Sequence, residues 1–377
     1  MKITFFSCYL TIHQLPISEM FFELLGEDYR YVATEPISKW RLEMGYEDID
    51  KKYSYVLTTY DSEENKKLAY KLAIESDVVI IGSAPDKYII SRLQEGKLTF
   101  KYSERPYKNG VHLNNFIRIL GGTWLHHGRF QKKSLYMLCA SAYTASDFAK
   151  FGCYKNKCFK WGYFPKFEVQ NLNNIAEIKQ KKNICSILWV GRLISWKHPE
   201  LVIKVADYLK RKGYLFEINI IGGGELKDIL KQMIDKLELQ NYVHIIGAIP
   251  SKDVRKFMEK ANIFLFTSDS REGWGAVLNE AMNSGCAVVA NPEIGSVPFL
   301  IKDSKNGFIY RNENELYEKV IYLMDNPDIC KQVGEEAYRT LELEWNERVA
   351  AIRFIELAEN LINGKRNMYK EGPCSPI

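Results

Sequence analysis

Short runs of hydrophobic residues alternate with longer amphipathic stretches along most of the chain, and this alternation is typical of α/β folds with parallel strands. In the first half, runs rich in β-branched and aromatic residues predict five strands, at residues 3–6, 31–34, 56–58, 77–81 and 98–102. Two of the stretches between them, residues 63–75 and 86–95, have the apolar spacing of helices. The first half therefore predicts an α/β unit of its own.

The second half repeats the alternation after a polar, lysine-rich connection at residues 171–183. Runs at residues 184–190, 216–221 and 262–267 predict buried parallel strands, each followed by a loop that contains glycine. A last helical stretch spans residues 346–363. The hydrophobic pattern therefore predicts two Rossmann-like domains.

Composition agrees with a folded chain that stays inside the cell. With 377 residues and a hydrophobic fraction of 46%, the chain can bury a core in each of two or three domains. The eight cysteines are scattered without a CxxC pair, which favours reduced thiols over disulfides or a zinc site. The apolar run at residues 3–12 precedes no small-residue cleavage site and predicts a first strand rather than a secretory signal. No apolar stretch is long enough to cross a bilayer, so a cytoplasmic protein is expected.

Two glutamates follow the predicted strand at residues 262–267, in the segment REGWGAVLNEAM. A helix that begins near Gly275 would present unpaired backbone amides to an anionic or hydroxylated ligand, and its glycines allow close approach. Glu272, in the loop, can accept hydrogen bonds from sugar hydroxyls, and Glu280, about a turn and a half into the helix, can reach a second polyol such as a ribose. The alternative is a capped surface helix with one exposed glutamate.

Two cations follow the predicted strand at residues 184–190. Arg192 and Lys197 would lie at the carboxyl end of a strand, where open α/β sheets bind ligands, and they can converge on a diphosphate. A similar glycine loop at residues 222–225 opens another helix. It lacks the third glycine of the dinucleotide fingerprint, so no nicotinamide cofactor is expected.

Together these segments resemble the retaining glycosyltransferases of family 4, which have the two-domain GT-B fold. The resemblance runs over residues 184–345 with the motifs in order, and the block EGWGAVLNEAMNSGCAVVA is its most specific part. It implies an α/β GT-B architecture, with two Rossmann-like domains that face each other across a cleft. The expected divisions are an acceptor-side domain, a linker, a nucleotide-sugar donor domain, a helix that packs back on the first domain, and a tail, at residues 1–165, 166–183, 184–345, 346–365 and 366–377.

The resemblance also implies roles for these residues. Arg192 and Lys197 would hold the donor diphosphate, Glu272 would contact the donor sugar, and these three form the expected catalytic set. Glu280 would bind the nucleotide ribose. The expected donor site is completed by backbone and side-chain groups of Gly191, Gly223, Glu225, Gly273, Trp274, Gly275, Ala276 and Val277. Residues 291–298 resemble a further glycine loop of the family, but Ser296 stands where a second glycine is common, which leaves the contacts of that loop open.

The acceptor side departs from the family pattern. The loop after the first strand lacks the usual paired glycines, and its His13 and Gln14 could hydrogen-bond an acceptor or the donor phosphates. A histidine that only caps the following helix is the alternative. Glu104 and Arg105 stand in a loop after the predicted strand at residues 98–102, and we expect them to face the cleft unless they form a structural ion pair. Many relatives have a histidine near position 103 or 104, and that role has no counterpart here.

The function implied by the resemblance is retaining transfer of a sugar, from a UDP- or GDP-linked donor, to a saccharide acceptor. Such enzymes often extend lipid-linked glycans of bacterial surface polysaccharides or capsule. No cofactor or metal is expected, because the one D-x-D sequence, at residues 48–50, lies far along the chain from the donor motifs. Two alternatives remain, an inactive nucleotide-sugar-binding or scaffold protein of the same fold and a nucleotide-sugar epimerase. The intact charged residues argue against the first, and the spacing of the two glutamates argues against the second.

Charge adds one hypothesis about partners. The net charge is +5, and basic and aromatic residues mix at residues 124–133 and 154–166. Such surfaces can rest on anionic lipid, which predicts peripheral contact with the inner face of the plasma membrane. A solvated basic face is the alternative. Nucleic-acid binding is not expected, because no recognised motif accompanies the basic residues.

Overall fold

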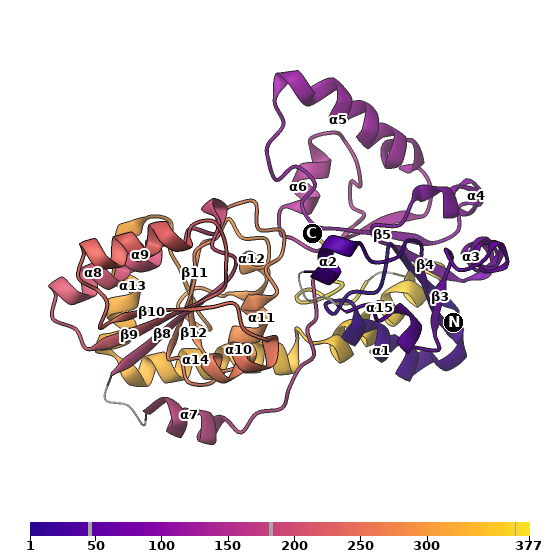
Figure 1. The fold of residues 1–377 in the computed structure, drawn as a ribbon. Helices are drawn as coiled ribbons and strands as arrows, with labels where there is room; N and C mark the ends of the chain where they lie inside the picture. Colours follow the sequence, from indigo (N-terminus) through magenta and orange to yellow (C-terminus); the bar gives the residue numbers. More distant parts are fainter. Residues whose placement is uncertain (44–46, 181–183, 366) are drawn as a thin grey trace. The chain divides into compact units, whose positions relative to one another are not determined.

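The computed structural model describes residues 1–43, 47–180, 184–365 and 367–377, which form two compact units (Figure 1). The N-terminal unit contains Met1–Lys166 together with Asn346–Ile377, and the C-terminal unit contains Phe167–Trp345. Residues 181–183, in the predicted linker, and residue 366, at the start of the predicted tail, lie outside the described residues. The rest of the linker includes a helix, α7 (Leu172–Gln180), that belongs to the C-terminal unit.

The N-terminal unit is built on a sheet that, within the described residues, has seven strands in the order β3-β2-β1-β4-β5-β6-β7, all paired in parallel. The five predicted strands are confirmed within two residues at each end, and two further strands follow them. The strands are β1 (Ile3–Ser7), β2 (Tyr29–Ala33), β3 (Val56–Thr58), β4 (Val78–Ile81), β5 (Thr99–Ser103), β6 (Leu135–Cys139) and β7 (Cys158–Lys160).

Helices connect these strands in Rossmann-like fashion. The helix predicted at residues 63–75 is confirmed as α3, and the one predicted at 86–95 is split into a 3₁₀ turn, η3 (Asp86–Tyr88), and a short α-helix. The α-helices of the unit are α1 (Leu15–Leu25), α2 (Lys39–Glu43), α3 (Glu63–Glu75), α4 (Ile90–Glu95), α5 (Leu113–His126), α6 (Thr144–Ala149) and α15 (Glu347–Ile362), with 3₁₀ turns η1 (Gly26–Asp28), η2 (Asp50–Lys52) and η4 (Gly128–Phe130).

The end of the chain packs within the N-terminal unit. Asn346 caps α15 by accepting a hydrogen bond from the Val349 amide, and Phe354 of this helix contacts Phe21 of α1 at a ring-centroid distance of 5.6 Å. The last residues then lie along the open edge of β7, where the amide of Lys160 donates to the carbonyl of Ser375 at 2.8 Å. This short segment covers a sheet edge that would otherwise expose unpaired backbone groups.

The segment at residues 154–166 does not form the surface that we expected to face a membrane. The side chains of Tyr154, Phe159, Trp161 and Phe164 are 1–5% exposed. The reason is β7, because this strand joins the sheet and its aromatic neighbours fill the core around it. The prediction of a lipid-facing aromatic surface is therefore wrong for this segment.

The C-terminal unit is a second parallel sheet, with six strands among the described residues in the order β10-β9-β8-β11-β12-β13. The three strands predicted here are confirmed as β8, β9 and β11. The strands are β8 (Cys185–Val190), β9 (Phe216–Ile221), β10 (Val243–Gly247), β11 (Ile263–Phe266), β12 (Ala287–Ala290) and β13 (Phe308–Ile309). Besides α7, the helices are α8 (Glu200–Arg211), α9 (Lys227–Lys236), α10 (Ser251–Met258), α11 (Val277–Asn283), α12 (Val297–Leu300), α13 (Glu313–Asp325) and α14 (Pro327–Leu343), and η5 (Ser195–Lys197) is a 3₁₀ turn.

The strand order indicates where a ligand would bind in the C-terminal unit. From β8 the chain moves outward through β9 and β10, and it then returns to β11 on the other side of β8 before it continues to β12 and β13. The order therefore reverses between β8 and β11. In open α/β sheets, ligands bind outside the carboxyl ends of the strands at such a reversal. The loops that carry Arg192, Lys197 and Glu272 leave these two strand ends.

Candidate active site

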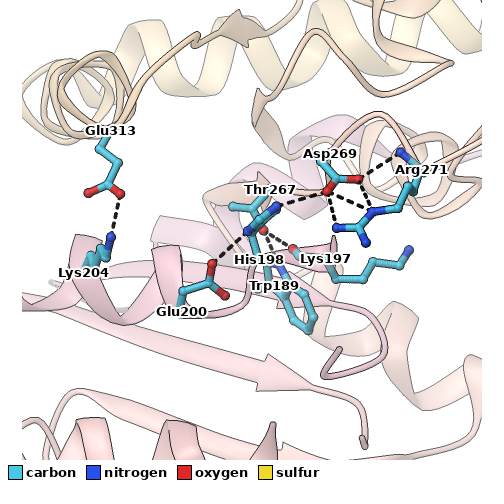
Figure 2. A network of polar contacts seen from close by, with 9 residues as sticks. All are labelled: Trp189, Lys197, His198, Glu200, Lys204, Thr267, Asp269, Arg271 and Glu313. Carbon is cyan, nitrogen blue, oxygen red and sulfur yellow. Dashed lines mark hydrogen bonds and ion pairs between the residues drawn. The ribbon is translucent and has the colours of Figure 1, made fainter. Parts of the chain in front are cut away.

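The loops after β8 and β11 are tied together by buried hydrogen bonds (Figure 2). The indole of Trp189 donates to the hydroxyl of Thr267 at 2.8 Å, and that hydroxyl donates to the backbone carbonyl of Lys197 at 2.7 Å. Trp189 lies one residue before the end of β8 and Thr267 follows β11, so these contacts fix the position of the Lys197 backbone relative to the two strand ends. The backbone of the loop that carries Lys197 is thus held in place before a ligand binds.

His198 also links the same two loops, because its ring contacts a carboxylate on each side. Its Nδ1 lies 2.8 Å from Glu200 and its Nε2 lies 3.3 Å from Asp269, which also pairs with Arg271 (Figure 2). The hydrogen bond with Glu200, aided by Asp269, raises the pKa of His198 above its ordinary value. The sequence motifs assign no role to His198, and the only signal for it is its position directly after Lys197 in the predicted ligand loop.

Lys197 and Glu272, expected to contact the diphosphate and the sugar of a donor, lie next to each other. The ammonium group of Lys197 forms an ion pair with Oε2 of Glu272, and the two side chains are 13% and 11% exposed. The hydroxyl of Ser268 also donates to this carboxylate oxygen, at 3.0 Å. The carboxylate is therefore held in one orientation, with its second oxygen outside these contacts.

Arg192 remains available to an anion. Its side chain is exposed and lies over the ring of Trp196, 5.8 Å from the ring centroid, and it has no carboxylate partner among the described residues. Lys197 approaches the same indole, with its Nζ 4.8 Å from the centroid. The Trp196 ring thus lies near both cations at the carboxyl end of β8, an arrangement suited to a diphosphate.

Glu280 is a half-buried carboxylate in the first turn of α11, nearer the helix start than expected because the helix begins at Val277 rather than near Gly275. Burial raises its pKa from an ordinary value of 4.5 to about 7, and the charge of Arg255 opposes this shift. Its carboxylate makes no hydrogen bond or ion pair within the part of the chain that the structure describes. A ligand hydroxyl would supply the hydrogen bond that it lacks.

The glycine loop after β9 supports the site through close backbone packing. A Cβ on Gly222 would lie 1.8 Å from the carbonyl oxygen of Gly191, and one on Gly224 would lie 2.4 Å from that of Leu193. Gly223, the residue expected at the donor, has no such neighbour, since Ala248 lies 3.9 Å from its ideal Cβ position. The flanking glycines therefore let the two loops touch, and Gly223 leaves open space beside them.

The segment between the two glutamates divides into core and site residues. Trp274 is fully buried, and its indole donates to Asn279 at 3.0 Å, so only its backbone can serve a ligand. Gly275 has φ +84°, and a Cβ there would lie 2.4 Å from Phe266. The remaining expected donor residues stand around this turn and the two glycine loops, with Gly273 buried, Gly191, Ala276 and Val277 half-buried, and Glu225 exposed.

Ser296 replaces the second glycine of the loop after β12 and is fully buried. Its amide donates to the carbonyl of Trp274 at 3.3 Å, and the amide of Gly295 donates to the carbonyl of Glu272 at the same distance. The loop thus supports the backbone on both sides of Gly273. The Ser296 hydroxyl has no hydrogen-bond partner among the described residues.

In the N-terminal unit, His13 and Glu104 are brought together by a residue that sequence reasoning missed. The His13 ring stacks on Tyr163 at a centroid distance of 5.6 Å, and the Tyr163 hydroxyl donates to Glu104 at 2.6 Å. Glu104 also pairs with Lys108. Burial lowers the pKa of His13 although the charge of Glu104 opposes this, so the ring is neutral near pH 7. No sequence spacing relates Tyr163 to the other two residues.

Gln14 and Arg105 are engaged in internal contacts. Gln14 is 8% exposed and accepts a hydrogen bond from the hydroxyl of Tyr31 at 2.8 Å. Arg105 pairs with the buried Asp147 at 3.4 Å and lies over the ring of Tyr143, which is the structural ion pair given above as its alternative. These two side chains therefore stabilise the loops that present His13 and Glu104.

The D-x-D sequence has a structural role. Asp50 is buried, and its two carboxylate oxygens accept hydrogen bonds from the Leu10 amide at 2.7 Å and the Tyr60 hydroxyl at 3.1 Å. Burial raises its pKa to about 6. Asp50 thus holds the loop after β1, and the described residues contain no cluster of three metal-ligating side chains.

Comparison with known proteins shows what this chain is similar to. Residues 170–340 match the family model for glycosyl transferases of group 1. The chain is similar to the structure of HepE from Anabaena in complex with UDP, with a TM-score of 0.70 and 16% identity over 96% of this chain and 100% of that one. The chain therefore has the GT-B fold, and its C-terminal unit is similar to the group 1 glycosyl transferases.

Two curated relatives have names that state a biosynthetic role or a substrate. The amylovoran biosynthesis glycosyltransferase AmsK of Erwinia amylovora is 30% identical over 46% of this chain and 44% of its own length. An N-acetylgalactosaminyltransferase of Campylobacter jejuni, named for a diphospho-undecaprenol substrate, is 24% identical over 72% of this chain and 73% of its own. The chain spans about half the length of the first curated relatives that it matches.

Among the described residues, no helix is both long enough and apolar enough to cross a bilayer.

Proposed function

We propose that the protein is a glycosyltransferase that binds a nucleoside-diphosphate sugar in its C-terminal unit and transfers the sugar to a saccharide acceptor. The observation that carries the proposal is the nearly buried Lys197–Glu272 ion pair, together with the exposed Arg192, which has no carboxylate partner among the described residues. These groups lie at the carboxyl ends of β8 and β11, where the strand order reverses. They also lie inside the segment that matches the group 1 glycosyl transferases.

Each group has a part of the donor to bind. Arg192 and Lys197 hold the diphosphate, Glu272 accepts from hydroxyls of the sugar, and Glu280 accepts from hydroxyls of the ribose. Gly223 leaves open space beside its own backbone, and the diphosphate fits into this space. The donor nucleotide is UDP or GDP, and the UDP complex of HepE supports UDP as the first to test.

The proposed reaction is retaining transfer. The bond between the anomeric carbon and the diphosphate oxygen breaks, and its electron pair moves to the leaving diphosphate. The acceptor hydroxyl forms the new bond on the face that the diphosphate leaves, and its proton passes to a phosphate oxygen. Arg192 and Lys197 stabilise the charge that grows on the leaving group, so the protein's own cations supply what a metal ion supplies elsewhere.

The acceptor is proposed to be a saccharide carried on a lipid, extended on the cytoplasmic side of the membrane during assembly of a surface polysaccharide. The printed names of AmsK and of the Campylobacter enzyme support this class. In the N-terminal unit, the neutral His13 ring and the carboxylate of Glu104, joined through Tyr163, are the groups proposed to contact it. A neutral imidazole can accept a hydrogen bond from a sugar hydroxyl.

The test is to incubate the protein with UDP- and GDP-linked sugars and saccharide acceptors, and to follow the anomeric signals by NMR. Transfer with the donor's configuration kept is the expected result, and it should be lost in Lys197→Ala. An inverted product would contradict the retaining mechanism. A nucleotide sugar that is isomerised without transfer would instead make the protein an epimerase, and nucleotide binding without turnover on any acceptor would favour the inactive binding protein.

A further inference from the structure

The backbone of His198 is in the left-handed conformation, with φ +49° and ψ +49°. This conformation is unfavourable for a residue with a Cβ, and the following Pro199 favours an extended backbone at position 198 instead. Six described residues other than glycine have a positive φ, and His198 is the one that lies in a loop of the candidate site. Strained residues of this kind persist only where their surroundings hold them, and they concentrate at functional sites.

The left-handed turn directly follows Lys197 and sets the direction of the chain there. The carbonyl of Lys197 accepts a hydrogen bond from the hydroxyl of Thr267 at 2.7 Å. The amide of His198 donates to the carbonyl of Ser195 at 3.2 Å, which closes the 3₁₀ turn η5 before the chain enters α8. A different backbone conformation at His198 would therefore rotate the peptide group that it shares with Lys197 and move the lysine away from Glu272.

The ring of His198 supplies the contacts that hold this turn (Figure 2). Its Nδ1 lies 2.8 Å from Glu200, on α8, and its Nε2 lies 3.3 Å from Asp269, in the loop after β11. Asp269 is itself paired with Arg271, and Lys197 is the charged neighbour of His198 in the chain. Only the protonated ring can donate to both carboxylates, because a neutral imidazole has one N–H. The hydrogen bond with Glu200 favours this form and raises the pKa of His198.

We propose that His198 is a positioning residue of the donor site. Its ring, paired with Glu200 and Asp269, holds the left-handed backbone that directs Lys197 toward Glu272. The proposal rests on the proposed function, because Lys197 is the group through which His198 acts. Glycine adopts the left-handed conformation without help from a side chain, whereas alanine does not. Glycine should therefore replace histidine at position 198, and alanine should not.

The test compares these two substitutions at pH 6, below the ordinary pKa of 6.5, where the ring is charged. His198→Ala should lower kcat at least about tenfold, because a small displacement of a catalytic group is costly. His198→Gly should recover most of this loss although it lacks the ring. The KM for the donor should change less than kcat in His198→Ala, since Lys197 acts mainly on the charge that develops on the leaving diphosphate.

The pH profile is a second readout. As pH rises above the raised pKa of His198, the ring loses one of its two hydrogen bonds, so kcat of the unchanged protein should fall relative to that of His198→Gly. Glu280 titrates in both proteins, so its effect cancels from this ratio. The free energy of unfolding should change in the same direction, because the contribution of His198 is complete below pH 6.5 and is lost as pH rises through the raised value. NMR of the ring, assigned by the signal that disappears in His198→Gly, measures this pKa without a ligand.

Glu238→Ala is the matched control. Glu238 also has a left-handed backbone, with φ +52°, and it lies in the same unit after α9, with 86% of its side chain exposed. Its substitution should leave kcat within about twofold of the unchanged protein, because its ion pair with Lys210 is exposed and contributes little. Circular dichroism verifies that every variant is folded.

The proposal is overturned if His198→Ala turns over like the unchanged protein, or if His198→Gly is as slow as His198→Ala. If the unchanged protein neither binds a nucleotide nor transfers a sugar, the proposed function fails instead. Denaturant unfolding at pH 6 still shows in that case whether the ring and the backbone are linked. His198→Gly should unfold at a higher denaturant concentration than His198→Ala, and equal midpoints would overturn the role of the ring in holding the turn.

Discussion

Lys197 and Glu272, 75 positions apart in the chain, form an ion pair in which both side chains are almost buried. Desolvating two charges is costly, and their attraction offsets that cost only in good geometry. The loops after β8 and β11 supply this geometry through the hydrogen bonds of Thr267. The cation proposed to hold the diphosphate and the carboxylate proposed to bind the sugar are therefore oriented together before a ligand binds, and transition-state stabilisation requires such preorganisation.

The first prediction concerns the cations of the donor site. Lys197→Ala and Arg192→Ala should each lower kcat at least about a hundredfold, because loss of one preorganised group costs on the order of 3 kcal/mol in the transition state. Initial rates of nucleotide release at saturating donor measure this.

Lys204→Ala is the control for both variants. Lys204 lies on α8 in the same unit, pairs with Glu313 and is 42% exposed (Figure 2). Its removal should leave kcat within about twofold of the unchanged protein, since an exposed pair contributes little. Unchanged turnover in Lys197→Ala and Arg192→Ala would remove the diphosphate assignment.

The second prediction is that nucleotide binding is linked to a proton on Glu280. Its pKa of about 7 leaves the carboxyl half protonated at neutral pH, and ribose hydroxyls hydrogen-bond best to the ionised form. Nucleotide affinity should therefore rise as pH increases from 6 to 8, by up to about tenfold per pH unit below the pKa. Calorimetry across this range measures the slope.

Glu280→Gln separates this proton from those of the nucleotide itself. The variant keeps the size of the side chain but cannot titrate, so it should bind more weakly and show only the pH dependence of the ligand phosphates. The pH dependence that Glu280 gives to folding stability has the opposite sign to the one that it gives to nucleotide affinity. A carboxyl whose pKa is raised from 4.5 to about 7 favours the folded state when protonated, so its contribution to the free energy of unfolding is lost as pH rises through that window. Equal pH profiles for the two proteins would contradict the assignment.

The third prediction compares two glycines with similar backbone angles. Gly275 and Gly213 have φ of +84° and +78°, but a Cβ would meet Phe266 at 2.4 Å in the first and nothing within 4 Å in the second. Gly213→Ala should cost about 1 kcal/mol of unfolding free energy, from φ alone, and Gly275→Ala at least about twice as much. Denaturant unfolding measures both. Equal costs would show that the approach of Gly275 to Phe266 is not constraining.

Sequence patterns predict strands best where residues are buried along the whole strand. Strands β8 and β11 are near-unbroken apolar runs because a parallel sheet is covered on both faces, whereas β9 alternates apolar residues with Glu217 and Asn219. The ends of these strands place the ligand loops. Strand β7 has three residues, like β3, but Lys157 and Lys160 interrupt its apolar pattern, so the sequence does not predict it. Its aromatic residues were interpreted as surface for the same reason, since only the tertiary structure shows that they fill the core.

For the candidate site, sequence patterns likewise predict some groupings of residues and miss others. The order of Arg192, Lys197, Glu272 and Glu280 along the chain was enough to group them, because carboxyl ends of neighbouring parallel strands meet at one sheet edge. The stacking of His13 on Tyr163 could not be anticipated, because contacts between loops 150 positions apart depend on side-chain packing. The side chain of Trp274 lies in the core for a related reason, since its indole finds its partner on α11.

The fourth prediction concerns the end of the chain. Cys374 and Ser375 are fully buried beside β7, so deleting residues 372–377 should expose that sheet edge and lower the melting temperature of the N-terminal unit by at least about 4 °C. Met368→Ser, at a residue 81% exposed, should leave it unchanged. Calorimetric melting checks both, and nucleotide binding by the C-terminal unit should survive the deletion. A deletion that melts like the full chain would show that the edge needs no cover.

The C-terminal unit is proposed to bind a nucleoside diphosphate through its own side chains. Titration calorimetry of UDP, GDP, ADP and CDP against the protein in EDTA, with Glu280→Ala and Lys197→Ala alongside, measures this binding. One nucleotide should bind clearly better than the others, and each substitution should weaken its binding at least about tenfold through loss of a charged hydrogen bond. Absence of binding by all four nucleotides, or binding that neither substitution weakens, would contradict it.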